Sequence, residues 1–112
     1  MVCILQISLR GKGIKDIAPL LSLLSRFQRL KSLDLSNNGL TGLPSDMSSL
    51  SRLETLNLTS NKVAVATAIL HGLQSLPALR HVWVNLPDEE QEDELVVGLP
   101  KLHSLNGVHL DE

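Results

Sequence analysis

The sequence predicts an α/β solenoid of about five turns, with parallel strands on a concave face and helices and bends on a convex face. Three observations support this fold class. Five copies of one aliphatic pattern run along the 112 residues, two segments carry a helical stripe of apolar residues, and only 2% of the residues are aromatic. A core with so few rings has to be built from branched aliphatic side chains, and stacked repeats provide such a core. We expect residues 1–112 to form a single domain, which matches their length.

The aliphatic pattern is L-x-x-L-x-L-x-x-N-x-L. Residues 30–40 (LKSLDLSNNGL) match it at every position, and residues 53–63 (LETLNLTSNKV) match it with one aliphatic exchange. Weaker copies place the five repeat starts near residues 4, 30, 53, 79 and 102. The intervals between these starts alternate between 26 and 23 residues, so the chain is organised in double units of 49 residues.

The longer intervals each carry apolar residues at the spacing of one helix face. The two stripes have the same internal spacing: Ile17, Leu20, Leu21, Leu24 and Phe27, then Ala66, Ile69, Leu70, Leu73 and Leu76. The shorter intervals leave less room for a helix. In the first of them, residues 41–45 (TGLPS) predict a bend, and we expect Leu43, Met47 and Leu50 to point inward.

Each repeat should place its fourth and sixth positions in the core, and the residues beside them should face outward. Leu33, Leu35, Leu56 and Leu58 are therefore expected to be fully buried. Asn38 and Asn61 stand where the chain leaves the strand. A side-chain amide there can both donate to and accept from the backbone of adjacent turns, so we expect these two asparagines to link turns.

These motifs resemble the leucine-rich repeat superfamily over nearly the whole length of the chain. The lack of cysteine-rich caps is similar to the intracellular branch, which includes phosphatase regulators, the spliceosomal A-prime protein and a light chain of axonemal dynein. The ending LPKLHSLNG, residues 99–107, resembles the terminal repeat of those proteins. This resemblance implies an intracellular protein. We expect it in the cytoplasm, and the alternative locations are the cytoskeleton and the nucleus.

The outward residues of the repeats predict a concave face of small polar side chains. Its three columns are Gln6, Ser32, Thr55, His81 and Ser104; Ser8, Asp34, Asn57, Trp83 and Asn106; and Arg10, Ser36, Thr59, Asn85 and Val108. Trp83 is the large aromatic side chain of this face, and exposed tryptophan is enriched at binding hot spots. The alternative is that its indole covers the neighbouring residues Asn57 and Asn106. The candidate partner-binding residues are Trp83, Asp34, Asn57, His81, Asn85 and Asn106.

A run of acidic residues follows Pro87 and precedes an apolar segment, which predicts the start of a helix with carboxylates at its first turn. The acidic residues are Asp88, Glu89, Glu90, Glu92, Asp93 and Glu94. They form either a solvated helix face or a docking segment for a basic partner. The net charge of −2 divides into nine Lys/Arg against four Asp/Glu in residues 1–87 and one against eight in residues 88–112. This division leaves no uniform basic footprint for nucleic acid.

The sequence contains no recognisable catalytic constellation, glycine-rich phosphate loop or metal cluster, so we expect neither enzyme activity nor a cofactor or metal. His81 and His103 lie on adjacent turns and could approach each other, without a third ligand for zinc. Cys3 is interpreted as an apolar filler, and a lone cysteine suits a reducing compartment. No apolar run reaches the roughly 18 residues that a membrane helix needs, so we expect no membrane partner.

The predicted function is a non-catalytic protein-binding module or scaffold with its partner on the concave face. The alternatives are an RNA-associated scaffold and a structural assembly module of a larger chain. The first strand has no polar helix ahead of it, so its outer edge offers unpaired backbone groups. We expect this edge either to contact another molecule or to be covered by a continuation of the chain.

Overall fold

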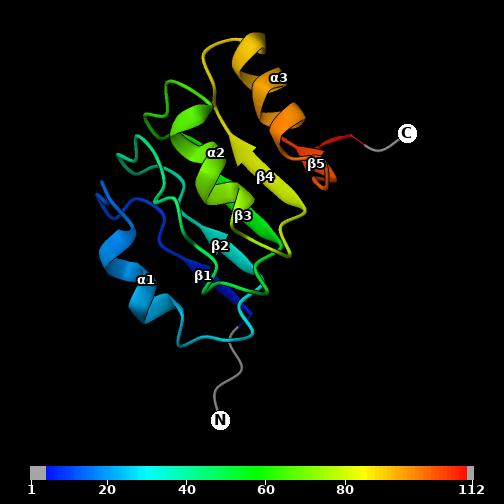
Figure 1. The fold of residues 1–112 in the computed structure, drawn as a ribbon. Helices are drawn as coiled ribbons and strands as arrows, with labels where there is room; N and C mark the ends of the chain where they lie inside the picture. The colour runs from blue at the N-terminus through cyan, green and yellow to red at the C-terminus, as the bar shows by residue number, and fades with distance from the viewer. Residues whose placement is uncertain (1–4, 111–112) are drawn as a thin grey trace.

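The computed structural model describes residues 5–110, and its strands form one sheet in chain order (Figure 1). The strands are β1 (Gln6–Ser8), β2 (Ser32–Asp34), β3 (Thr55–Leu58), β4 (His81–Val84), β5 (Ser104–Leu105) and β6 (Val108–His109). Strands β1 to β5 pair in parallel, and β6 pairs antiparallel with β5. The parallel order confirms the α/β solenoid expected from the repeats.

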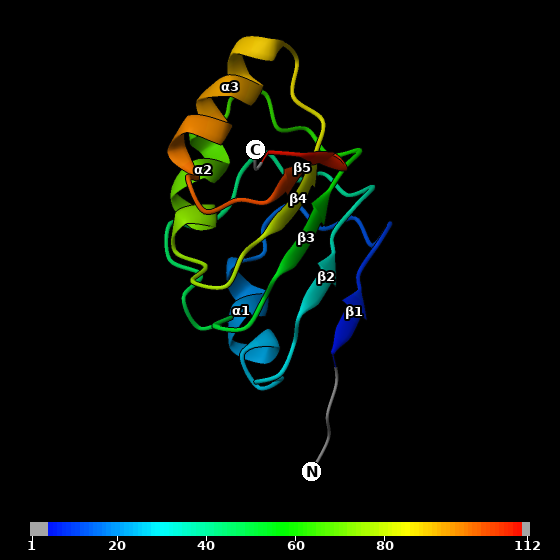
Figure 2. The same ribbon diagram turned by 90° about the vertical axis from the view of Figure 1, so that its right-hand side faces the viewer.

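Within residues 5–110, three helices cover one side of this sheet (Figure 2). They are α1 (Ala18–Leu24), α2 (Thr67–Gln74) and α3 (Glu89–Gly98). The first two coincide with the predicted apolar stripes, whose residues Ile17, Leu24, Ile69 and Leu73 are buried. The bend predicted after residue 40 is also present, since residues 41–50 contain no helix and Met47 and Leu50 are buried, with Leu43 half-buried.

The core is a continuous stack of aliphatic side chains between the sheet and the helices. Leu33 pairs with Leu56, which pairs with Val82, and the exposed fraction of each side chain is 0%. Leu35 is 0% and Leu58 is 1% exposed, which confirms the predicted inward positions. Cys3 and Ile4, the first aliphatic position of the first repeat, lie outside the described residues.

Asn38 and Asn61 link successive turns through their side-chain amides, as predicted. The Nδ2 of Asn61 donates to the carbonyl of Leu35 at 2.9 Å on the preceding turn and to the carbonyl of Leu58 at 3.0 Å on its own turn. Its Oδ1 accepts from the amide of Leu40 at 3.1 Å. Asn38 repeats this arrangement one turn earlier, with its Nδ2 donating to the carbonyl of Leu9 at 3.0 Å.

Gly72 lets helix α2 approach the preceding bend closely. A Cβ atom added there would lie 2.6 Å from the carbonyl oxygen of Pro44 and 2.9 Å from the Cβ of Leu43. The same region is joined by a hydrogen bond of 2.7 Å from the amide of Met47 to the hydroxyl of Ser75. Close packing of this bend on α2 is therefore a matter of backbone contact as well as of apolar side chains.

The end of the sheet differs from the sequence-based expectation of one more parallel strand reaching Val108. After β5 the chain reverses at Asn106 and Gly107, whose φ angles are 54° and 82°, and Val108 pairs with Leu105 in the antiparallel strand β6. Two consecutive residues with positive φ favour a type I′ hairpin, and Asn-Gly is the preferred dipeptide for it. Placing Val108 in the third concave column was therefore wrong.

Strand β1 forms the other margin of the sheet, and among the described residues no strand covers its outer side. Leu9 and Gly11 donate their amides to the carbonyls of Asp34 and Ser36, so these groups face β2. In a parallel strand the backbone groups of the alternate residues, Gln6 and Ser8, point to the opposite side. The open edge predicted for the first repeat is thus present in the part of the chain that the structure describes.

Candidate functional site: the concave face

The strand register places two of the predicted columns as continuous rows on the exposed side of the sheet. Gln6, Ser32, Thr55, His81 and Ser104 form the first row, and Ser8, Asp34, Asn57 and Trp83 form the second. Residues of β2 to β4 alternate between buried and half-buried, so the row residues face away from the core. Ser104 is the exception, because only 3% of it is exposed.

Trp83 projects from the middle of β4 and is half-buried. Its ring centroid lies 6.5 Å from that of His81, with 42° between the ring planes. On its other side is the hairpin, since a Cβ atom added to Gly107 would lie 4.0 Å from the indole Nε1. The indole thus lies close to His81 and the hairpin, and part of its surface is exposed to solvent.

His81 connects Trp83 to the last turn of the solenoid. Its Nδ1 lies 2.8 Å from the hydroxyl of Ser104, so the polar group of this buried serine has a hydrogen-bond partner. Its ring centroid is 6.1 Å from that of His103 in an edge-to-face arrangement. The two histidines therefore meet as their sequence positions suggested. Among residues 5–110 no group of three or more His, Cys, Asp or Glu side chains is arranged to hold a metal ion.

The four remaining candidate residues use a side-chain oxygen to fix the ends of strands. Asp34 accepts from the amide of Ser36 at 2.9 Å, and Asn57 accepts from the amide of Thr59 at 3.0 Å. Asn85 accepts from the amide of Ser60 at 2.8 Å, and Asn106 accepts from the amide of Val84 at 2.8 Å. These bonds hold the carboxyl ends of β2, β3 and β4 in defined positions around Trp83.

The repeat pattern predicts Asn106 in a concave column on the last parallel strand, whereas the structure places it in the turn between β5 and β6. It stands in the hairpin turn, and its side chain caps the backbone of β4. Gly107, which sequence reasoning did not include in the site, lies beside the indole. The Asn-Gly dipeptide was the available signal for both features.

The acidic segment begins helix α3, as predicted. Asp88 is the N-cap residue, and its carboxylate accepts from the amide of Gln91 at 3.0 Å. Gln91 in turn accepts from the amide of Ala66 through its side-chain Oε1 at 2.8 Å, which joins α3 to the turn before α2. Asp93 and Glu94 of this helix are exposed to solvent.

A succession of parallel strands, convex helices and an asparagine ladder defines a repeat solenoid with leucine at its core positions. The sequence family described as "Leucine Rich repeats (2 copies)" matches residues 28–69. The chain belongs to the leucine-rich repeat superfamily. Domains of this superfamily generally mediate protein–protein interaction, and they are typically non-catalytic.

Two relatives show the repeats inside much longer proteins. A mouse (Mus musculus) protein, "Leucine-rich repeat and WD repeat-containing protein 1", is 40% identical over 88 residues, 77% of this chain and 13% of its own length. An Arabidopsis thaliana protein is 43% identical over 61 residues, 54% of this chain and 8% of its own length; its name is "Probably inactive leucine-rich repeat receptor-like protein kinase". The chain thus spans a small part of both relatives. None of the helices described here is long and apolar enough to cross a membrane.

Proposed function

We propose that the chain is a non-catalytic protein-interaction module whose partner binds the concave face, with Trp83 at the centre of the contact. The observation that carries this proposal is a half-buried indole on a central strand, surrounded by small polar side chains. Asn57 lies beside it on β3, Asp34 lies one strand further on β2, and His81 and Asn85 stand two positions before and after it along the chain. Asn106 stands in the neighbouring hairpin. Tryptophan is the residue type that most often supplies a large share of binding energy in such a place.

The bonding of these residues supports binding without a large ordering cost. The side-chain oxygens of Asp34, Asn57, Asn85 and Asn106 are each held by a backbone amide. Side chains that are already ordered lose less conformational entropy when a partner binds. The indole and the adjoining imidazoles of His81 and His103 would then offer the partner an aromatic strip on a rigid support.

The test is affinity capture of protein partners on the immobilised chain, with two matched variants. Trp83→Ala removes the proposed hot spot, and Leu23→Ala truncates a side chain that is 52% exposed on α1, on the convex side. We expect Trp83→Ala to weaken partner binding by about 2 kcal/mol or more, and Leu23→Ala to leave it unchanged. Equal capture by both variants, or an unfolded Trp83→Ala protein, would remove the basis for the proposal.

The acidic start of α3 is proposed as a second contact for a basic segment of the same partner. Exposed charges are screened over about 10 Å at 0.1 M salt, so affinity should fall as salt is added. Replacing Glu89, Glu90, Glu92 and Glu94 with glutamine should reduce both the affinity and its salt dependence. Binding that is indifferent to salt and to these replacements would leave the segment as a solvated helix face.

A structural module of a longer chain is the second candidate, favoured by the small share of each relative that the repeats occupy. In that case the solenoid would act by contacts with other domains of its own chain. The solenoid expressed alone would then bind those other domains when they are added separately.

An RNA-associated scaffold is the third candidate, and captured partners that disappear after nuclease treatment would indicate it. The proposed location is intracellular, in the cytoplasm, and the alternatives are the cytoskeleton and the nucleus.

A further inference from the structure

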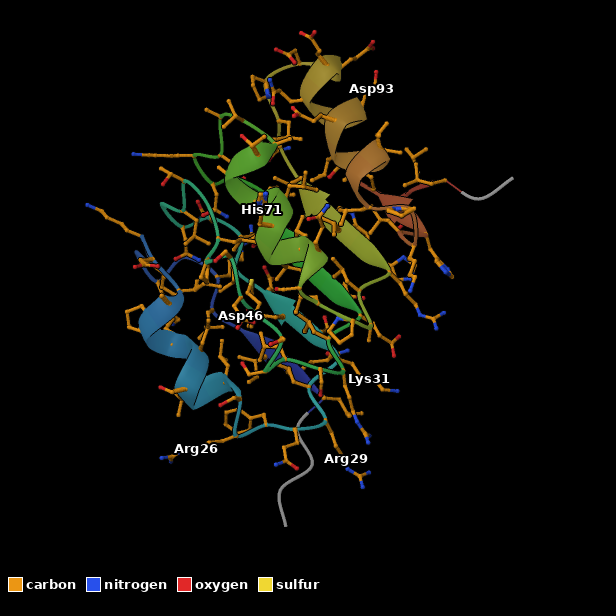
Figure 3. The ribbon with its side chains drawn as sticks, viewed as in Figure 1. Arg26, Arg29, Lys31, Asp46, His71 and Asp93 are labelled. Atoms are coloured by element: carbon orange, nitrogen blue, oxygen red, sulfur yellow. The ribbon has the colours of Figure 1, made fainter. Side chains whose placement is uncertain are left out.

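A second surface lies where the chain enters the strands, away from the acidic start of α3. We define this surface, the amino edge, by residues 25–31, 49–54, 76–80 and 99–103. These segments hold six of the ten Lys and Arg residues, with Glu54 as their acidic residue. Figure 3 places Arg26, Arg29 and Lys31 at the lower end of the molecule and Asp93 of α3 at the upper end. These three cations of the amino edge therefore lie away from the carboxylates of α3.

Backbone hydrogen bonds between turns align the residues of the amino edge. The carbonyl of Lys31 accepts from the amide of Glu54, that of Glu54 from Arg80, and that of Arg80 from His103, each at 2.8 Å. Two positions earlier in each turn, the same register gives a parallel row: Arg29, Arg52, Ala78 and Lys101. Neighbouring strands lie about 4.8 Å apart, so this row spans about 15 Å from its first to its last member.

One end of the row is a polar hollow with many hydrogen-bond donors. Its lining residues are Ser25, Gln28, Arg29, Ser49, Ser51 and Arg52. Guanidinium groups pair with carboxylates through two parallel hydrogen bonds, and hydroxyl groups can donate to the remaining oxygen lone pairs. The lining of this hollow therefore fits a group that carries negative charge on planar oxygens.

The other end of the row is an apolar crevice of about 250 Å³. Its floor is formed by four core leucines, each 5–8% exposed: Leu76, Leu79, Leu99 and Leu102. Leucines in the centre of the solenoid, such as Leu33 and Leu56, are 0% exposed. Pro77 and Pro100 form the rim together with Lys101. The crevice can accept one apolar side chain beside a cation.

We propose that the amino edge is a docking surface for an acidic protein segment that carries one apolar anchor residue. The carboxylates pair with Arg29 and Arg52, and the anchor enters the crevice near Lys101. An extended peptide advances about 3.3 Å per residue, so the anchor lies about five positions from the carboxylates. Phosphates of a nucleic acid would also pair with arginine. The crevice, however, is lined by leucine and proline and offers no aromatic platform on which bases stack.

The test is a titration of the ¹⁵N-labelled chain, at low ionic strength, with a synthetic peptide followed by amide chemical shifts. The probe peptide contains two adjacent glutamates, a Gly-Ser spacer and a leucine at the proposed spacing. We expect the shift changes to fall in the four segments of the amino edge. Replacing the two glutamates with glutamine, or the leucine with serine, should weaken binding about tenfold in each case.

A pair of matched double variants locates the binding site on the chain. Arg29→Glu with Arg52→Glu should weaken binding of the peptide at least about tenfold. Arg10→Glu with Lys62→Glu changes the charge equally at exposed positions beyond the carboxyl ends of β1 and β3, and should leave the affinity within about twofold. Circular dichroism confirms that both variants are folded before their affinities are compared.

Four outcomes would overturn the proposal. The first is a set of shift changes centred on Trp83 instead of the amino edge. The second is equal binding of the leucine and serine peptides, which would show that the crevice is not used. The third is tighter binding of an oligouridine to the same segments, which would assign the edge to nucleic acid. The fourth is self-association of the free chain that Arg29→Glu with Arg52→Glu abolishes, which would make a second copy the occupant.

Discussion

Replacing Asn61 with alanine should destabilise the solenoid by about 2–4 kcal/mol. The side chain makes four hydrogen bonds: its Nδ2 donates to the carbonyls of Leu35 at 2.9 Å, Leu58 at 3.0 Å and Thr59 at 3.2 Å, and its Oδ1 accepts from the amide of Leu40 at 3.1 Å. A hydrogen bond contributes about 1 kcal/mol net, and a backbone group left without a partner in a sheltered place costs about 1–3 kcal/mol. Asn61 is half-buried, so water can partly replace the lost partners. The expected loss of about 2–4 kcal/mol is therefore smaller than the full cost of leaving every partner unsatisfied.

The assay is equilibrium unfolding in urea, followed by circular dichroism, with Thr41→Ala as the control. Thr41 is exposed and follows Leu40 directly, so its truncation should change the free energy of unfolding by less than about 0.5 kcal/mol. Asn61→Asp provides a sharper comparison, because aspartate keeps an acceptor for Leu40 but sets carboxylate oxygen against the carbonyls of Leu35 and Leu58. At neutral pH it should be at least as destabilising as alanine. If Asn61→Asp were as stable as the unmodified chain, the amide would not link the turns by donation.

Three further predictions concern other parts of the fold. Leu56→Ala should cost about 2–5 kcal/mol in urea unfolding, because the leucine is 0% exposed in the central strand, and a loss below about 1 kcal/mol would contradict the assigned register. Gly72→Ala should lower the thermal midpoint, since its new Cβ would lie 2.6 Å from the carbonyl oxygen of Pro44, and a variant with an unchanged midpoint would contradict that close approach. The hydroxyl and then the amide of Ser48 lower the pKa of Asp46 by donating to its carboxylate. Ser48→Ala should therefore raise that pKa in an NMR titration. The folded pKa lies below the unfolded one, so this contribution to stability is present at neutral pH and is lost as pH falls through the folded pKa.

The repeat period allowed most of the fold to be predicted from the sequence. Leu33 and Leu56 recur at the same position of two well-matched copies, and that spacing fixes which side chains are buried and which strands pair. The two apolar stripes predicted α1 and α2 correctly. Each has the spacing of one helix face, and both stand at the same position in their repeats, which leaves few other interpretations. The reversal at Asn106 and Gly107 was missed because Leu102 and Leu105 continue the repeat pattern up to the turn.

The candidate site was predicted less completely than the fold. A column assignment tells which face Asp34 and Asn57 occupy, but not that their oxygens are engaged by the amides of Ser36 and Thr59. Those bonds depend on how the chain bends after each strand. The amino edge could not be found from the sequence, because its cations are separated by 20 or more residues in most cases and meet only when the turns are in register.

The antiparallel hairpin of β5 and β6 limits where further repeats can be added to the solenoid. Parallel turns can be duplicated where one strand already lies beside another of the same sense, as between β2 and β3 or between β3 and β4. Beyond β6 an added turn would meet a strand of the opposite sense, and its side-chain amide would find no matching ladder of carbonyls. A longer version of this solenoid is therefore best engineered by inserting whole double units between β2 and β4. Such insertions would widen the spacing between β1 and Trp83 while leaving the aromatic strip beside the hairpin intact.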